Sequence, residues 1–173
     1  MTRDELRAAQ APLKDKYRQS PESAVVTLRA RGTLGEGVTC DIEVAPAPGG
    51  VTKAGLHPAT GGSGHEACSG DMLLQSLVAC SGVTLSAVAT ALGLVVRGGT
   101  LVAEGDVDFR GTLGVAKDGP VGFTAIRLRV ALDTDASAAE IAKLLELTER
   151  YCVVYQTLKR GVPATVSYAT GPA

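Results

Sequence analysis

The sequence predicts a single α+β domain, and three observations lead to that prediction. Short segments with alternating apolar and polar residues indicate strands, the clearest being residues 121–132. One long stretch, residues 71–94, is apolar on nearly every side and is typical of a buried helix. The order of these elements is irregular, which argues against the repeated strand–helix alternation of a parallel α/β sheet.

Composition narrows the class of protein. The chain has 173 residues, enough for one domain with a sizeable core. Hydrophobic residues make up 45% and charged residues 20%, and the formal net charge is −1. This near-neutral charge argues against nucleic acid as a partner. The lack of a long uninterrupted apolar run argues against a membrane span.

The predicted elements follow one another as helix, hairpin, short strand, long helix, strand pair, two helices and a last strand. The strands are expected at residues 23–32, 38–44, 51–56, 95–109, 121–132 and 162–168, and the helices at residues 2–18, 71–94, 137–150 and 151–158. The Pro- and Gly-containing stretch 45–50 is expected to interrupt the strand pattern. Residues 57–69 are expected to form a functional or mobile loop. We therefore expect a helical extension at residues 1–20 and the domain proper at residues 21–173.

The long helix at residues 71–94 also bears on assembly. It has one charge in 24 residues and would be about 36 Å long. A single sheet cannot cover such a helix on all sides, so we expect a second copy of the chain to complete its burial in a homodimer.

The cysteines are the first candidates for chemistry. The N-terminal residues are charged and lack the apolar stretch of a secretory signal, so we expect a cytoplasmic protein. In that reducing compartment a disulfide scaffold from Cys40, Cys68, Cys80 and Cys152 is not expected. A special cysteine would then be catalytic or metal-binding, while the alternative for each is a small buried core residue.

Three segments resemble signatures of the OsmC/Ohr family. Residues 71–84 (DMLLQSLVACSGVT) resemble its central helix, in which an acidic residue begins an apolar run that leads to a cysteine. Residues 149–158 (ERYCVVYQTL) resemble its second signature, an acidic helix end followed by cysteine and then Thr-Leu. Residues 161–168 (GVPATVSY) are similar to its last strand, and the resemblance extends over residues 23–170.

The resemblance implies a fold and an activity. The fold would be a curved antiparallel sheet wrapped around the central helix, in an interlocked homodimer. The activity would be thiol-dependent reduction of organic hydroperoxides in oxidative stress defence, without a cofactor or metal. Cys80 would be the peroxidatic thiolate and Cys152 the resolving thiol of an intramolecular disulfide. An external dithiol of the lipoyl or thioredoxin-like type would reduce that disulfide.

The resemblance also implies supporting residues. In the family an arginine from the first strand or the following turn activates the thiolate, and an acidic residue at the start of the central helix orients it. Arg31 and Arg29 match the arginine, with Arg31 preferred beside the turn; a solvated sheet face is the alternative. Asp71 matches the acidic residue, or is a first-turn helix charge. Tyr151 and Tyr155 are candidates for an apolar substrate channel, or for core packing.

Two features depart from the pattern or complicate it. Val153 stands where the family usually has proline after the second cysteine, so the local turn is expected to differ. Cys68 with His65 could contribute to a metal site, but zinc sites normally need four closely spaced ligands. As a resolving thiol, Cys68 would lie about 18 Å along the helix from Cys80, beyond disulfide range in one chain. Cys40 is expected in the core.

Two other functions remain open at this stage. One is a non-catalytic protein of the same fold that binds a small apolar ligand in the dimer cavity. The other is a structural dimer whose cysteines are inert. A thiol pKa of Cys80 well below the usual cysteine value of about 8.5 would favour the enzyme.

Overall fold

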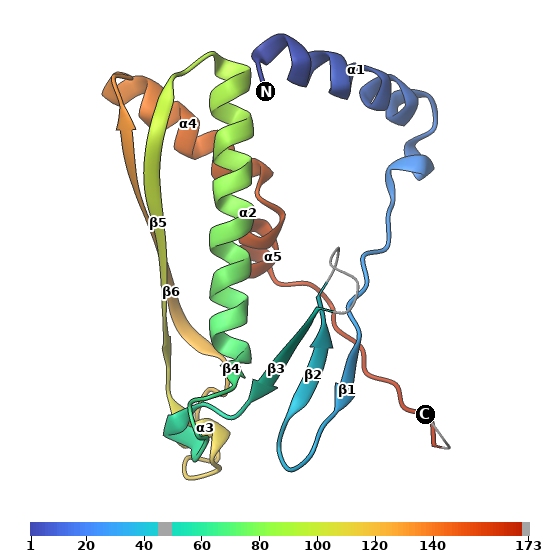
Figure 1. The fold of residues 1–173 in the computed structure, drawn as a ribbon, viewed down its shortest axis with the longest axis vertical. Helices are drawn as coiled ribbons and strands as arrows, with labels where there is room; N and C mark the ends of the chain where they lie inside the picture. The colour runs from blue at the N-terminus through green and yellow to red at the C-terminus, as the bar shows by residue number, and fades with distance from the viewer. Residues whose placement is uncertain (45–49, 171–173) are drawn as a thin grey trace.

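The computed structural model describes residues 1–44 and 50–170, and helix α2 (Ser69–Leu92) forms its axis (Figure 1). The other elements are helices α1 (Arg3–Gln19), α3 (Phe109–Thr112), α4 (Ala138–Tyr151) and α5 (Val153–Arg160), the 3-10 turns η1 (Pro21–Ala24) and η2 (Pro58–Thr60), and strands β1 (Gly32–Leu34), β2 (Cys40–Glu43), β3 (Val51–Gly55), β4 (Ala67–Cys68), β5 (Val96–Val107) and β6 (Phe123–Thr134). The expected α+β architecture around a long apolar helix is confirmed.

The strands in the described part of the chain form two sheets. Strands β1, β2 and β3 are antiparallel neighbours, and the short β4 pairs in parallel with β3. This confirms the strands expected at residues 38–44 and 51–56, but the first strand of the hairpin lies at Gly32–Leu34 and not at residues 23–32. Most of the predicted break at 45–50 lies outside the described residues. Strands β5 and β6 form a separate antiparallel ribbon that runs beside α2 (Figure 1).

The core lies where α2, α4 and the ribbon meet. Leu85, Val88 and Ala89 of α2 pack with Leu144 of α4, and all four are buried. The partly buried side chains around them are Leu94, Val96, Val130, Leu132, Leu145 and Leu147. On β6 the partly buried and exposed positions alternate, as the period-2 pattern predicts for a strand with one covered face.

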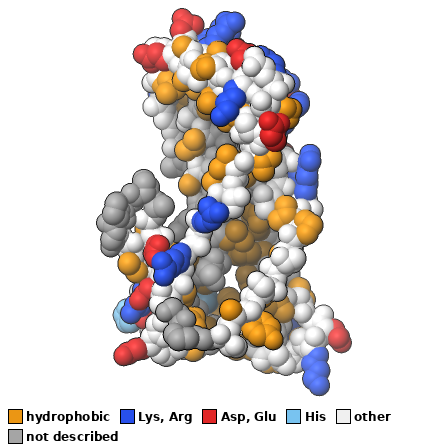
Figure 2. All heavy atoms as spheres, turned by 90° about the vertical axis from the view of Figure 1, so that its right-hand side faces the viewer, with side chains coloured by type: hydrophobic (Ala, Val, Ile, Leu, Met, Phe, Trp, Pro, Cys, Tyr) orange, Lys and Arg blue, Asp and Glu red, His pale blue; other side chains and the backbone are white. Residues whose placement is uncertain are grey.

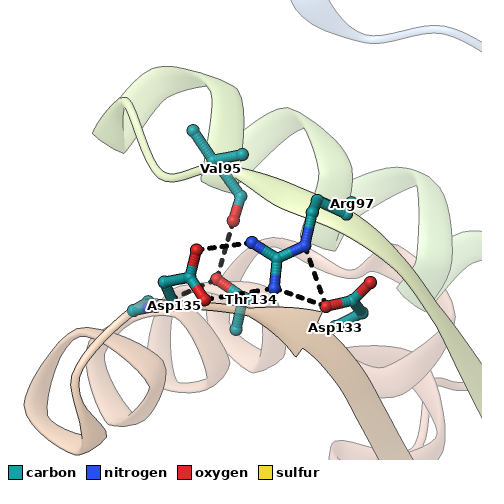
Figure 3. Close-up of polar contacts among 6 residues, drawn as sticks. Val95, Arg97, Asp133, Thr134 and Asp135 are labelled. Carbon is teal, nitrogen blue, oxygen red and sulfur yellow. Dashed lines mark hydrogen bonds and ion pairs between the residues drawn. The ribbon is translucent and has the colours of Figure 1, made fainter.

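A polar cluster closes the same end of the ribbon (Figure 3). Arg97 on β5 donates from Nε to Asp133 Oδ1 at 2.9 Å and from Nη1 to Asp135 Oδ2 at 2.5 Å. The Thr134 hydroxyl donates to the Val95 carbonyl at 2.7 Å. These contacts join the start of β5 to the end of β6, immediately before α4 begins, and so fix where α4 enters the core.

Helix α1 confirms the predicted N-terminal helix. Thr2 caps it, and the Glu5 side chain accepts from the Thr2 backbone N–H at 2.7 Å, completing a capping box. None of its residues is buried, and its contacts within the chain are with α2 and η1. The packing of α1 in this chain therefore depends on few apolar contacts.

Two predicted strands are wrong in part or in whole. Of residues 23–32, only Gly32 enters a strand. The Arg31 carbonyl accepts from the Glu43 backbone N–H at 3.0 Å, and residues 25–30 form an exposed, unpaired segment. Residues 162–168 are likewise exposed and outside any strand. Alternation shows that a segment suits a sheet face, but a strand also needs a partner for its backbone groups. The described part of this chain offers neither segment such a partner.

Much apolar surface remains uncovered. By length and composition α2 could cross a membrane, a property that core helices of soluble proteins share, and only 22% of its most apolar window is buried. Val83 on α2 is 72% exposed, and Leu28 and Val166 in the unpaired segments are 86% and 99% exposed. Figure 2 shows hydrophobic side chains gathered in a hollow on the face that bears the unpaired segment after α1. A monomer with this surface has an incomplete core.

Candidate active site

Cys152 lies at the junction of α4 and α5 and is 0% exposed. Its backbone N–H donates to the Thr148 carbonyl at 2.9 Å and ends α4. Its sulfur accepts the Tyr155 backbone N–H at 3.4 Å and caps α5, as a serine or aspartate oxygen often does. The local sequence thus uses one cysteine to end one helix and to start the next, which fixes the orientation of its side chain.

Cys80 lies in the middle of α2, half-buried and facing the start of α5. Burial of this thiol raises its pKa, but hydrogen bonds from the Val154 backbone, the Cys152 thiol, the Val153 backbone and the Thr84 side chain outweigh that effect. The pKa of Cys80 therefore lies below its ordinary value. The structure brings the two sequence-predicted cysteines together, in a reduced state.

The donors to Cys80 come from the N-terminus of a different helix. The dipole of α2 itself is weak at mid-helix, whereas the first N–H groups of α5 have no partners within α5. Val153 stands where the family usually has proline, and its backbone N–H is one of these donors. A proline at position 153 has no N–H and could not donate to the Cys80 sulfur.

Sequence reasoning missed Ser81 and Thr84. The Ser81 hydroxyl is 1% exposed and lies 3.4 Å from Cys152 Sγ, while Thr84 is one helical turn after Cys80 and bonds to its sulfur. The spacing of Thr84 from Cys80 was a signal, because residues at i+4 share a helix face. Ser81 carried no such signal, since α2 is apolar on all sides and its buried face cannot be recognised from the sequence.

The candidate arginines lie elsewhere in the single chain. Arg31 Nε is 3.6 Å from Glu43 Oε1 on the β1–β2 hairpin, and both side chains are well exposed. Arg29 is exposed in the unpaired segment before β1. Among the described residues, no arginine contributes to the pKa shift of Cys80. The structure therefore does not place either arginine at the sulfur within one chain.

Asp71 lies in the first turn of α2 and lines a cavity of about 630 Å³. Cys68, Leu74, Phe109 and Phe123 also line this cavity, which does not include Cys80. The ring of His57 stacks on Phe109 with centroids 5.0 Å apart, which closes one wall. Asp71 is thus at the start of α2, nine residues before Cys80, and is separated from its sulfur as the helical spacing predicts.

The two candidate tyrosines differ in their surroundings. Tyr155 donates from its hydroxyl to Glu149 Oε2 at 2.9 Å and is partly buried beside a cavity of about 360 Å³ that Leu77 and Leu128 also line. Burial raises the pKa of Tyr155, and the adjacent Glu149 carboxylate raises it further. Tyr151 is 56% exposed, with the Arg150 guanidinium 5.4 Å from its ring centre. Tyr155 is therefore the one that borders an apolar space near Cys152.

The remaining cysteines and histidines are away from this centre. Cys40 begins β2 and is partly buried, and Cys68 precedes α2. His65 is exposed in the loop before β4. Within residues 1–44 and 50–170, no three His, Cys, Asp or Glu side chains are arranged to hold a metal ion.

Comparison with protein families identifies the chain. The family model for OsmC-like proteins matches residues 62–167, which span α2, the ribbon, α4, α5 and both cysteines of the centre. The chain belongs to the OsmC-like family. A search of the curated proteins finds no significant match.

Solved structures share the OsmC-like fold. An OsmC-like protein from Mycoplasma pneumoniae superimposes with a TM-score of 0.65 at 17% identity, over 79% of this chain and 89% of that chain. An organic hydroperoxide resistance protein OsmC from Legionella pneumophila gives 0.61 at 15% identity, over 80% and 92%. One from Elizabethkingia anophelis gives 0.57 at 16% identity, over 80% and 91%. At these identities the superpositions establish the fold.

Proposed function

We propose that this OsmC-like protein is a cysteine-based peroxidase that reduces organic hydroperoxides in oxidative stress defence. The observation that carries the proposal is the contact of Cys80 with Cys152, which are distant in the sequence. Cys80 is half-buried and Cys152 is fully buried. The lowered pKa of Cys80 supports it, because only the thiolate attacks a peroxide. The hydroperoxide resistance proteins of the same fold give further support.

The proposed cycle has three balanced steps. The Cys80 thiolate attacks the peroxide, an S–O bond forms, the O–O bond breaks, and the alkoxide takes a proton and leaves as an alcohol. Cys152 then attacks the sulfur of the Cys80 sulfenic acid and the hydroxyl leaves as water, with the proton that Cys152 loses. An external dithiol, of the lipoyl or thioredoxin-like type, reduces the disulfide and is itself oxidised. A cytoplasmic location would supply such a reductant.

We further propose that the working unit is a homodimer whose second chain brings an arginine to Cys80. The uncovered surface of α2 and the two unpaired strand-like segments support a second copy. Arg31 is the preferred arginine, because it is exposed on the β1–β2 hairpin and only loosely paired with Glu43. A guanidinium can hold a thiolate and a peroxide oxygen together, as its planar fork offers several donors.

The test is consumption of cumene hydroperoxide with dihydrolipoamide as the reductant. Cys80→Ser should abolish consumption, and Cys152→Ser should consume about one equivalent per chain and then stop. Cys68→Ser is the matched control, because it removes another partly buried thiol outside the centre, and it should behave as the parent protein. Continued turnover by the Cys80→Ser variant would refute the proposal.

Binding of a small apolar ligand is a second candidate function. The cavity of about 630 Å³ favours it, because Leu74, Phe109 and Phe123 line a space of the size that small ligands occupy. Titration with the fluorescent apolar probe 1,8-ANS tests it. Saturable binding that Leu74→Trp blocks and Cys80→Ser leaves unchanged would support a binding role independent of the thiols, whereas no saturable binding would reject it.

A further inference from the structure

We propose that Ser81 is a positioning residue for disulfide formation, which holds Cys152 through a hydrogen bond to its sulfur. The Ser81 hydroxyl oxygen lies 3.4 Å from Cys152 Sγ, and both side chains are buried, at 1% and 0% exposed. The inference rests on the proposed redox pairing of Cys80 with Cys152. It assigns to Ser81, the residue after Cys80, an effect on the sulfur of Cys152 rather than on the sulfur of Cys80.

The direction of the Ser81 side chain differs from that of other hydroxyls in α2. Ser76, Ser86 and Thr90 each donate to the carbonyl four residues earlier, at 2.8 to 2.9 Å, as hydroxyls in helices commonly do. Among the hydrogen bonds of the described residues, Ser81 instead contacts Cys152. A buried hydroxyl that bonds across to another helix is placed there by tertiary packing, and its loss would leave a buried sulfur with fewer partners.

Either atom can donate in the contact of Ser81 with Cys152. The Cys152 thiol has one hydrogen, and a hydrogen bond from this thiol is among the causes that lower the pKa of Cys80. The Tyr155 backbone N–H donates to Cys152 Sγ at 3.4 Å. If the thiol hydrogen of Cys152 faces Cys80, then the hydrogen between Ser81 and Cys152 must come from the serine. In that arrangement, a chain of donation runs from the Ser81 hydroxyl to Cys152 and on to Cys80.

This chain of donors has a consequence for the second chemical step. When Cys80 is a sulfenic acid, Cys152 must lose its proton and attack the Cys80 sulfur, and the displaced hydroxyl departs with that proton as water. A buried thiolate without donors is strongly disfavoured. Ser81 and the Tyr155 N–H already point at Cys152 Sγ, so they stabilise the negative charge as it develops without rearrangement.

An aryl disulfide reagent allows the reaction of Cys80 to be followed separately from that of Cys152, without a peroxide. With 5,5′-dithiobis(2-nitrobenzoate), Cys80 displaces one aryl thiolate and forms a mixed disulfide. Cys152 then attacks the Cys80 sulfur, closes the Cys80–Cys152 disulfide and releases a second aryl thiolate. Alkylation of the remaining thiols at timed intervals and mass spectrometry of the joined peptides give the closure rate. The same quench after one equivalent of cumene hydroperoxide follows closure from the sulfenic acid.

Three variants of the full chain make the test specific. Ser81→Ala should slow closure on the order of ten-fold, since one hydrogen bond to a charged group is lost, and should leave the first displacement at Cys80 nearly unchanged. Ser81→Thr keeps the hydroxyl and should recover most of the rate. Ser86→Ala, which removes an exposed serine of the same helix that bonds within α2, should match the parent protein.

The outcomes separate this inference from the proposed function. Slow closure in Ser81→Ala with recovery in Ser81→Thr supports the positioning role. Closure at the parental rate in Ser81→Ala overturns it, as does equally slow closure in Ser81→Thr, because packing and not the hydroxyl would then be responsible. If the parent closes the disulfide with the aryl reagent but does not consume hydroperoxide, the peroxidase proposal fails while the role of Ser81 is still decided. If the parent closes it with neither reagent, both fail.

Discussion

Helix α5 begins beside the middle of helix α2, and the backbone N–H of Val153, the first residue of α5, helps to lower the pKa of the Cys80 thiol. The donor belongs to a residue that follows Cys152 directly, so the start of α5 serves both sulfurs at once. Val154 adds a second N–H to Cys80, and Tyr155 gives its N–H to Cys152. Part of the thiolate stabilisation therefore comes from backbone N–H groups, which only a substitution by proline removes.

Replacing Val153 by proline tests this arrangement. Proline is well tolerated at the first position of a helix, and Cys152 before it already has the extended backbone, φ −72° and ψ 110°, that a residue before proline adopts. Val153→Pro should therefore keep α5 while it raises the pKa of Cys80 and slows its alkylation at neutral pH several-fold. Val153→Ala keeps the N–H and should behave as the parent. An unchanged Cys80 titration in the proline variant would contradict the proposed donor.

The pH dependence of Cys80 follows from the direction of its shift. Its alkylation rate by iodoacetamide should rise with pH and reach half its maximum at a lower pH in the folded protein than in the unfolded chain. Because the pKa is lower in the folded than in the unfolded chain, ionisation stabilises the fold above the unfolded pKa. That contribution is lost as the pH falls through the folded pKa. Peptide mapping at each pH isolates Cys80, and a midpoint no lower in the folded protein than in the unfolded chain would disprove the shift.

Mixing two inactive variants should reveal whether the arginine acts between subunits. Arg31→Ala should reduce peroxidase activity on the order of a hundred-fold, since it removes a charge that stabilises the reacting oxygen. Equal amounts of Arg31→Ala and Cys80→Ser chains, unfolded together and refolded, should recover about a quarter of the parental activity if the sites are shared. Arg29→Ala mixed in the same way is the comparison. No recovery in either mixture would place the arginine in the same chain as Cys80 or remove it from the site.

Leu144 should be essential to the core that holds α4. It is 1% exposed and packs with Leu85, Val88 and Ala89 of α2. Leu144→Ala should lower the free energy of unfolding by about 2–5 kcal/mol, because it removes buried methyl groups and leaves a cavity. Leu113, 56% exposed, is the control, and its change to alanine should cost less than about 0.5 kcal/mol. Urea unfolding followed by circular dichroism measures both, and equal effects would show that Leu144 is not a core anchor.

Local patterns in the sequence were sufficient for most elements. The alternation at residues 121–132 predicted β6 because one face of a ribbon beside a helix is covered and the other is not. The apolar run at 71–94 predicted α2 to within two residues at each end, and Gly93, with φ 75°, ends it in the left-handed conformation that glycine adopts readily. The same kind of pattern failed at residues 162–168, because pairing depends on a neighbour that the pattern does not contain.

The candidate site was accessible from the sequence only in part. Cys80 and Cys152 were singled out by the resemblance of their surroundings to the OsmC/Ohr family, and Asp71 was correctly expected to be far from Cys80 on a continuous helix. The contribution of Val153 and the contact of Ser81 with Cys152 were not predictable, since both depend on how α5 packs against α2.

The sequence by itself determined where the helices and most strands form, which residues carry reactive sulfur, and that α2 is too apolar to be covered by one sheet. These properties depend on interactions between residues close in the chain and on the total apolar surface. Only the tertiary structure decided which groups surround each sulfur. A hydrogen bond acts over about 3 Å, and the donors to Cys80 and Cys152 reach them through the packing of helices that are far apart in the sequence.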